Sequence, residues 1–199
     1  MPNIKFTKGE LKRQRDNLRR FERFLPILQL KKQQIQLEIQ RIHEKLSLKL
    51  QEIDELENEI GEWANLLQEP GEDIGKWVKP KEIIIGTSNI AGVDIPVFEG
   101  LKFEEPEYDL FLTALWVDIA ISRIRQFVIL LEEERVLNKQ LSFLSEELRI
   151  TNQRVNLFEK VKIPESKENA RRIRIYLCDQ QTNAVGRSKI AKRKLSFIA

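Results

Sequence analysis

The sequence predicts an all-α protein, a long antiparallel two-helix coiled coil with a short central β-hairpin segment. Apolar residues recur in seven-residue repeats along two long stretches, and glycine and proline gather in one central stretch. Charged residues make up 33% of the chain, with only eight Gly and seven Pro, a balance typical of long solvated helices. We therefore expect one elongated domain over 1–199, divided into 8–69, 70–106, 107–163 and 165–195.

The first predicted helix spans residues 8–69. Thr7 and Glu10 fit a capping box at its start. One heptad register is apolar at eight of nine positions: Leu11, Leu18, Leu25, Lys32, Ile39, Leu46, Ile53, Ile60 and Leu67. Its companion is apolar at six of eight: Gln14, Phe21, Leu28, Ile35, Ile42, Lys49, Leu56 and Trp63. A repeat sustained this long indicates a coiled coil. Because Pro26 lies off the apolar stripe, we expect it to bend the helix without ending it.

The central segment, 70–106, breaks the helical pattern. It holds five glycines and four prolines and a β-branched run from Lys81 to Phe98. We predict a hairpin in which Ile83–Ile85 pairs with Val93–Val97 across Thr87–Gly92. Two strands alone are marginally stable, so the hairpin must lean on the helices or on a partner.

The second predicted helix spans 107–163, with Pro106 in its first turn. Eight of ten stripe positions are apolar: Phe127, Leu130, Glu134, Leu137, Leu141, Leu144, Leu148, Thr151, Val155 and Phe158. A flanking row widens the stripe, which predicts more than one neighbour for this helix: Ile129, Val136, Phe143, Ile150 and Leu157. Pro164 is expected to kink or break the helix before a basic third stretch, 165–195.

Both ends of the chain are basic. Residues 1–23 carry eight Lys/Arg against three acids, and residues 171–199 carry eight against Asp179 alone. With a net charge of +3 overall, the middle is acidic. An antiparallel hairpin of helices brings 8–23 beside 171–195, so we expect the two basic ends to share one tip.

Charge alone leaves three functions open. The basic ends fit a protein partner, a nucleic-acid-binding coiled coil, or a generic scaffold whose charges are solvated helix faces. Few aromatic residues are interleaved with the basic ones, apart from Phe21, Phe24 and Tyr176, which weakens the nucleic-acid reading.

Residues for catalysis are scarce. No P-loop, G-x-S-x-G, H-E-x-x-H or paired-cysteine motif occurs. One histidine, His43, and one cysteine, Cys178, nearly exclude a histidine-based triad or a zinc cage. We expect His43 on the surface and Cys178 as a small packing residue. The sequence thus predicts no catalytic, cofactor-binding or metal-binding residues, and a chain that is not an enzyme by itself.

The sequence also indicates where in the cell the protein is located. No apolar stretch approaches the length of a membrane span, and the N-terminus lacks a signal peptide pattern. A single cysteine fits a reducing compartment. We expect a cytoplasmic protein without direct membrane insertion.

Three segments resemble a known family, and the least specific of them is the basic opening from Thr7 to Leu11. The run from Thr151 to Pro164, T-N-Q-R-V-N-L-F-E-K-V-K-I-P, resembles the T-x-R-R-V-N-A-L-E…I-P signature of the D subunit of V/A-type rotary ATPases. The matching residues are Arg154, Val155, Asn156, Glu159, Ile163 and Pro164. Gln153 stands where an arginine is common, and Leu157-Phe158 replaces Ala-Leu. Asn89, Gly92 and Pro96 are similar to the family's central N-x-x-G-V-x-[VI]-P segment.

The resemblance implies a rotor shaft without cofactors, peripheral to the membrane as part of the ATPase complex. In this family both chain ends enter the hexamer of catalytic A and B subunits, and the other end binds the F subunit and the membrane-ring adaptor subunit. The shaft couples ATP hydrolysis or synthesis to ion translocation, and no direct nucleic-acid partner is expected. We predict that complementary charge holds the basic tip in the hexamer. The candidate contacts are Lys12, Arg13, Arg15, Arg19, Arg20, Arg187, Lys189, Lys192 and Arg193.

Overall fold

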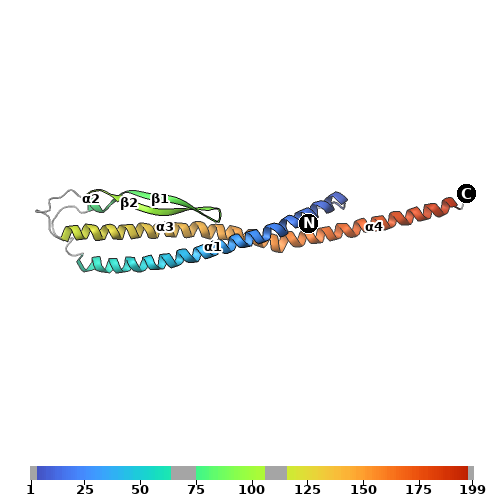
Figure 1. The fold of residues 1–199 in the computed structure, drawn as a ribbon. Helices are drawn as coiled ribbons and strands as arrows, with labels where there is room; N and C mark the ends of the chain where they lie inside the picture. Colours follow the sequence, from blue (N-terminus) through green and yellow to red (C-terminus); the bar gives the residue numbers. More distant parts are fainter. Residues whose placement is uncertain (1–3, 64–74, 106–115, 197–199) are drawn as a thin grey trace. The chain divides into compact units, whose positions relative to one another are not determined.

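Five helical segments and one hairpin make up the described part of the chain, residues 4–63, 75–105 and 116–196 of a computed structural model. The elements in chain order are α1 (Lys8–Trp63), α2 (Gly75–Val78), β1 (Pro80–Ile90), β2 (Val93–Phe103), α3 (Trp116–Leu157), the π-helical turn η2 (Phe158–Lys162) and α4 (Ile163–Ser196) (Figure 1). The predicted all-α coiled coil with a short hairpin is confirmed. The predicted helical residues 64–69 and 107–115 lie outside the described residues.

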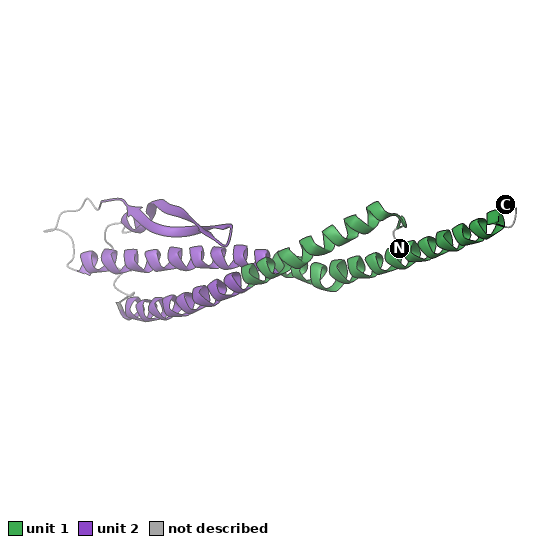
Figure 2. Cartoon of the chain, turned by 45° about the vertical axis from the view of Figure 1, so that its right-hand side comes forward, with its two compact units in different colours: residues 1–32, 150–199 green, residues 33–149 purple. Residues whose placement is uncertain are grey.

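The chain divides into two compact units (Figure 2). Unit 1 comprises residues 1–32 and 150–199, and unit 2 comprises residues 33–149. Unit 1 therefore holds the start of α1, the end of α3, η2 and α4. Unit 2 holds the rest of α1, α2, the hairpin and most of α3.

The start of α1 has one half of the predicted capping box. Thr7 Oγ1 accepts a hydrogen bond from the Glu10 N–H at 3.2 Å, which satisfies one of the free N–H groups of the first turn. The Glu10 side chain accepts instead from Gln14 Nε2 at 2.8 Å. Pro26 lies inside α1, and the helix continues through it as predicted.

The predicted apolar stripes form the core of unit 2. Ile35, Ile42 and Leu144 are buried together with Ile95 of β2. A second cluster joins Ile53, Leu56 and Leu130. Full burial of one such side chain contributes about 1.5–3 kcal/mol, so these clusters are the main support for pairing α1 with α3.

Ion pairs show that the two helices of unit 2 run antiparallel. Lys49 Nζ lies 3.0 Å from Glu133 Oε2, and Arg123 Nη2 lies 3.2 Å from Glu59 Oε1. As the residue number rises on α1, the number of its partner falls on α3. The predicted orientation is therefore confirmed within this unit.

The hairpin turns over two residues only. Ile90 pairs with Val93, which leaves Ala91 at φ 52° and Gly92 at φ 77° in the turn. Two positive φ angles are the mark of a type I′ turn, whose twist matches that of the flanking strands. Asn89 Oδ1 accepts the Gly92 N–H at 3.1 Å and holds the turn.

The predicted register of the hairpin is wrong. Ile83 pairs with Leu101 and Ile85 with Phe98, whereas we expected both to face Val93–Val97. Thr87, predicted to begin the loop, lies inside β1. The reason is the tight turn, because Ala91 adopts the left-handed conformation and both strands then extend to 11 residues.

The hairpin packs on the helices of unit 2, where it runs along α3 (Figure 1). Ile95 is 3% exposed and joins the core cluster. Gln140 Nε2 of α3 donates to the Pro96 carbonyl oxygen. The hairpin thus gains from the helices the support that two strands lack alone.

Unit 1 is a second antiparallel pairing, between the start of α1 and the end of α3 with α4. The Phe21 and Phe158 rings lie 5.1 Å apart, and the Phe6 and Tyr176 rings lie 5.0 Å apart. Ile173 is fully buried. Residues 6–21 therefore face residues 158–176.

The helical backbone continues past Pro164, where the sequence predicted a kink or a break. The turn η2 precedes it, and the Ile163 N–H donates to the Phe158 carbonyl oxygen, five residues back. Proline has no N–H and cannot donate to the carbonyl of Lys160. A local change of hydrogen-bonding pattern, with Pro164 in the first turn of α4, takes the place of a break.

Candidate partner-binding surfaces

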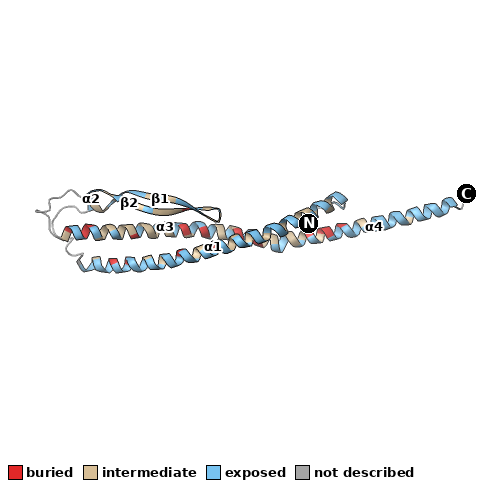
Figure 3. Ribbon diagram, viewed as in Figure 1, coloured by how far each residue is buried: buried red, intermediate tan, exposed pale blue. Residues whose placement is uncertain are grey.

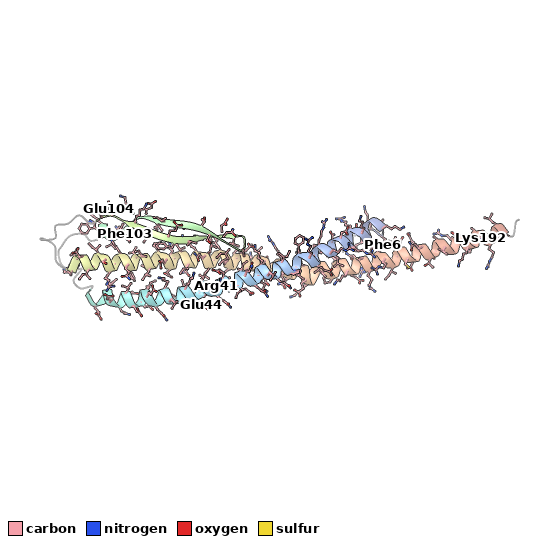
Figure 4. All side chains as sticks on the ribbon, in the orientation of Figure 1. Phe6, Arg41, Glu44, Phe103, Glu104 and Lys192 are labelled. Atoms are coloured by element: carbon pink, nitrogen blue, oxygen red, sulfur yellow. The ribbon has the colours of Figure 1, made fainter. Side chains whose placement is uncertain are left out.

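All nine predicted basic contacts are exposed and belong to unit 1. Five lie on the first turns of α1: Lys12, Arg13, Arg15, Arg19 and Arg20. Four lie near the end of α4: Arg187, Lys189, Lys192 and Arg193. The predicted juxtaposition of the two sets is wrong. Phe6 already faces Tyr176, so the α4 set lies further along the helix, as Lys192 does in Figure 4.

Residues 177–196, called here the α4 extension, run past the start of α1. At 1.5 Å per residue this segment is about 30 Å long. Its large apolar side chains are mostly in solvent, with Val185 55%, Ile190 60% and Leu195 69% exposed (Figure 3). The exposure follows because α1 begins at Lys8 and offers no further turns to cover the helix. The α4 extension is a solvated helix with apolar and basic side chains available to a partner.

The two residues weighed for chemistry are both on the surface. His43 is exposed as predicted. Cys178 is exposed as well, and the prediction that it packs is wrong because it lies just past Tyr176, where α1 no longer faces α4. Within residues 4–63, 75–105 and 116–196 the structure holds no cluster of metal-ligating side chains. None of the described helices combines the length and the low charge needed to cross a membrane.

The first set of motif residues shapes the hairpin. Asn89 bonds the turn and also donates from Nδ2 to Asp94 Oδ1 at 2.6 Å. Gly92 supplies the positive φ, and the Pro96 carbonyl accepts from Gln140. Each residue of this motif has a structural role at or near the hairpin tip.

The second set of motif residues surrounds η2. Arg154, Val155 and Asn156 lie in the last turn of α3, and Glu159 lies in η2 itself. Ile163 and Pro164 begin α4. Of these, Val155 is buried at 5% exposure. The motif coincides with the change from α- to π-helical hydrogen bonding.

A groove of about 460 Å³, called here the hairpin groove, lies in unit 2 between the hairpin and the two helices. It is lined by Glu38, Ile42, Lys45, Leu48, Lys49, Glu52, Ser88, Ile90, Ile95, Val97, Phe98, Glu133, Val136, Leu137 and Gln140. Its interior is apolar, and charged side chains lie among the lining residues. The groove is therefore suited to an apolar group with charged neighbours.

One lysine bridges the two helices at this groove. Lys49 Nζ lies 2.9 Å from Glu52 Oε2 on its own helix and 3.0 Å from Glu133 Oε2 on α3. The hydrogen bonds that Lys49 Nζ donates to these carboxylates raise the pKa of Lys49 above its ordinary value. Two carboxylates share one ammonium group, so this part of the lining keeps a negative charge.

Arg125 of α3 fastens the open end of the hairpin. Its Nε donates to the Trp77 carbonyl at 2.9 Å, and its Nη2 donates to the Glu104 carbonyl. The guanidinium also lies 5.0 Å from the centre of the Phe103 ring, a cation–π distance. Phe103 and Glu104 mark this end in Figure 4. One side chain thus holds α2, which precedes β1, and the outer end of β2 to α3.

Sequence reasoning missed these cross-element contacts. Lys32 and Lys49 interrupt otherwise apolar heptad positions, and that interruption was the available signal. Lys32 Nζ bonds Asn152 Oδ1 at 2.9 Å in unit 1, as Lys49 bonds Glu133 in unit 2. Arg125 and Gln140 had no comparable signal, because their partners are backbone carbonyls in and beside the hairpin.

Comparison with known proteins places these features in a family. The model of the family described as the ATP synthase D subunit matches residues 10–193. The D subunit of the V-type ATP synthase of Borreliella burgdorferi is 45% identical over 197 residues, covering 98% of this chain and 96% of the relative. The corresponding D subunit of Chlamydia felis is 34% identical over 194 residues, covering 96% and 93%. The likeness therefore extends over both units.

Proposed function

Because this chain belongs to the D-subunit family of V-type ATP synthases, we propose that it is the central-stalk rotor shaft of such a complex. It would couple ATP hydrolysis or synthesis in the catalytic hexamer to ion translocation across the membrane. The chain would transmit torque and carry no active site of its own.

The α4 extension is the observation that carries this proposal. This helical segment is about 30 Å long, and its side chains Ile190 and Leu195 leave apolar surface exposed to water. Most of the stability of a helix in a protein comes from packing of its apolar face. A surrounding partner would bury this surface, as a hexamer of catalytic subunits enclosing the end of a shaft would do.

Unit 2 is the candidate surface for a second set of partners. Its hairpin is fastened to α3 at both ends, by Arg125 and by Gln140, so it presents a fixed surface. We propose the F subunit and the membrane-ring adaptor subunit as the partners of this unit. The chain would then be cytoplasmic and peripheral to the membrane, held there by the complex.

The proposal is tested by charge reversal in the α4 extension. The variant R187E/K189E/K192E/R193E changes four exposed side chains and should leave the fold intact. Co-expressed with the catalytic subunits, it should recover much less hexamer than the unaltered chain at moderate salt, because charge complementarity is inverted. Affinity capture followed by ATPase assay measures both assembly and coupling.

A variant of unit 2 is the control for total charge. K76E/K79E/K81E/K139E also reverses four exposed basic residues, and it should retain the hexamer. Equal recovery with the unaltered chain and both variants would refute a charged contact through α4. Salt-dependent retention of nucleic acid, with no hexamer captured at all, would favour the nucleic-acid-binding coiled coil instead.

A further inference from the structure

The two units carry opposite charge. Unit 1 has 22 Lys/Arg against seven Asp/Glu, a net charge of +15. Unit 2 has 12 Lys/Arg against 24 Asp/Glu, a net charge of −12. The chain has a net charge of only +3, yet it consists of two units with strong and opposite net charges. Any two copies of this chain attract each other when unlike units meet.

Within unit 1, the α4 extension presents an apolar side chain among basic ones. Ile190 is 60% exposed. Arg187, Arg193 and Lys194 stand three residues before, three after and four after it, which places them beside it on the helix surface. All three are exposed. This arrangement presents one aliphatic group surrounded by positive charge.

Within unit 2, the hairpin groove has the complementary chemistry. Ile42, Ile95 and Val136 line its interior, and each is under 7% exposed. Glu38, Glu52 and Glu133 are the acids of its lining, against Lys45 and Lys49. Leu48 belongs to the same lining and is 60% exposed, so apolar surface there remains uncovered by the described residues.

We propose that the isolated chain self-associates, with the α4 extension of one copy docked in the hairpin groove of a second copy. Ile190 enters the apolar interior beside Leu48, and the neighbouring arginines meet the acidic lining residues. The contact joins two different surfaces, so copies form closed pairs or longer chains according to geometry. Before the chain joins a complex, this contact would cover the apolar surfaces of the α4 extension and of the hairpin groove at once. The binding of other partners would then displace it.

The experiment measures the mass of the full chain by sedimentation equilibrium. At 50 mM salt we expect a mass above the 23.5 kDa monomer that rises with protein concentration. At 500 mM salt we expect the monomer, because the Debye length falls from roughly 14 Å to roughly 4 Å and unlike charges are screened. A monomeric mass at 50 mM over the whole concentration range would overturn the proposal.

Two single substitutions locate the contact. Leu48→Glu and Ile190→Glu should each raise the apparent dissociation constant at least about tenfold, because each places a carboxylate at the centre of a desolvated contact. Leu37→Glu and Val185→Glu are the controls, since both residues are 55–57% exposed on the same helices but Leu37 lies outside the groove lining. Val185 lies five residues from Ile190, on another side of α4. The controls should change the constant less than about twofold.

The outcomes separate this contact from other causes of association. Circular dichroism at each salt concentration verifies that every variant keeps its helical content. If controls and test variants weaken association equally, general charge attraction explains it and the docking proposal fails. It fails also if nuclease treatment abolishes association, since nucleic acid would then link the copies. These measurements use the chain alone, so they stand whether or not the shaft function is correct.

Discussion

Arg125 connects α3 to α2 and to the outer end of β2. Its contacts are two backbone carbonyls and one aromatic ring, a set that needs the planar, forked donor geometry of a guanidinium. Lysine supplies the charge without the fork. At this position a change that keeps the charge therefore still removes contacts.

We expect Arg125→Lys to lower the free energy of unfolding by about 1–3 kcal/mol, since a carbonyl partner loses its donor. Urea denaturation measures the change, and amide exchange should quicken at the outer strand ends. Arg123→Lys is the control, because Arg123 forms a surface pair with Glu59 worth under about 1 kcal/mol. Equal losses in the two variants would contradict the role of Arg125.

Among the described residues, Glu168 is the carboxylate whose pKa is lowered furthest. Hydrogen bonds from Arg171 and Arg172 lower its pKa from 4.5 to about 2. Because the pKa of Glu168 is lower in the folded state, its interactions stabilise the fold at a pH above the ordinary pKa. This contribution is lost as pH falls from 4.5 towards 2. Because the group is exposed on α4, we expect a small effect on unfolding but a clear one on titration.

Carboxyl NMR titration of Glu168 tests this expectation. The variant R171Q/R172Q should return the pKa of Glu168 towards 4.5, because the two guanidinium hydrogen-bond donors that lower this pKa are gone. Glu146, paired with Arg149 alone, should titrate as before in the same variant. A Glu168 pKa that stays low would mean that other charges of α4 are responsible.

The hairpin shows, at the scale of an element, where prediction from sequence succeeds and fails. Its existence followed from β-branched residues and glycines between Lys81 and Phe98. Its register did not, because register depends on whether Ala91 accepts a positive φ, and Ala91 packs against the cluster that Ile95 forms with the helices. Such tertiary packing leaves no pattern along the chain.

The turn gives a prediction of its own. Ala91→Gly should stabilise the protein by about 0.5–1 kcal/mol, since glycine avoids the cost of the left-handed conformation but loses more entropy on folding. Gly92→Ala should destabilise it by about 1 kcal/mol for the converse reason. Thermal unfolding of the two variants measures both. If Ala91→Gly were the more harmful change, the two-residue turn would be in doubt.

The helices show the same division. Heptad counting identified the buried positions Ile35, Ile42 and Leu144, because each helix needs one continuous face to pair. It did not reveal how far α4 runs past α1. That offset depends on which aromatic residues meet, Phe6 with Tyr176, and many registers share the same heptad spacing.

At the scale of the whole molecule, charge follows the division into units more closely than it follows the chain ends. The sequence indicated two basic ends and an acidic middle. In the structure the net positive charge of +15 belongs to unit 1, and the net negative charge of −12 belongs to unit 2. The candidate basic contacts thus share a unit, although the α1 and α4 sets do not face each other.

Removal of residues 177–199 tests how far the fold depends on the α4 extension. Its described side chains lie almost wholly in solvent, so the truncated chain should melt within about 2 °C of the full one. Capture of the catalytic hexamer should nevertheless fall sharply. Truncation after Arg172 is the contrast, since it also removes the fully buried Ile173 and should lower the melting temperature.

The turn η2 has a consequence for insertions and deletions. The apolar stripe through Val155 would continue to residues 165, 169 and 172, yet three of the four buried residues of α4 lie one position later, at Ser166, Ala170 and Ile173, with Asn169 as the fourth. The wider π-helical turn absorbs one surplus residue and returns the following helix to its buried face. Deleting one residue from 158–162 would remove that surplus, so a regular α-helix would replace the wider turn and Ser166 and Ile173 would keep their buried face. Deleting a residue between Ile163 and Ile173 would instead rotate every residue beyond the deletion by about 100°, aiming every basic side chain of the α4 extension in a new direction.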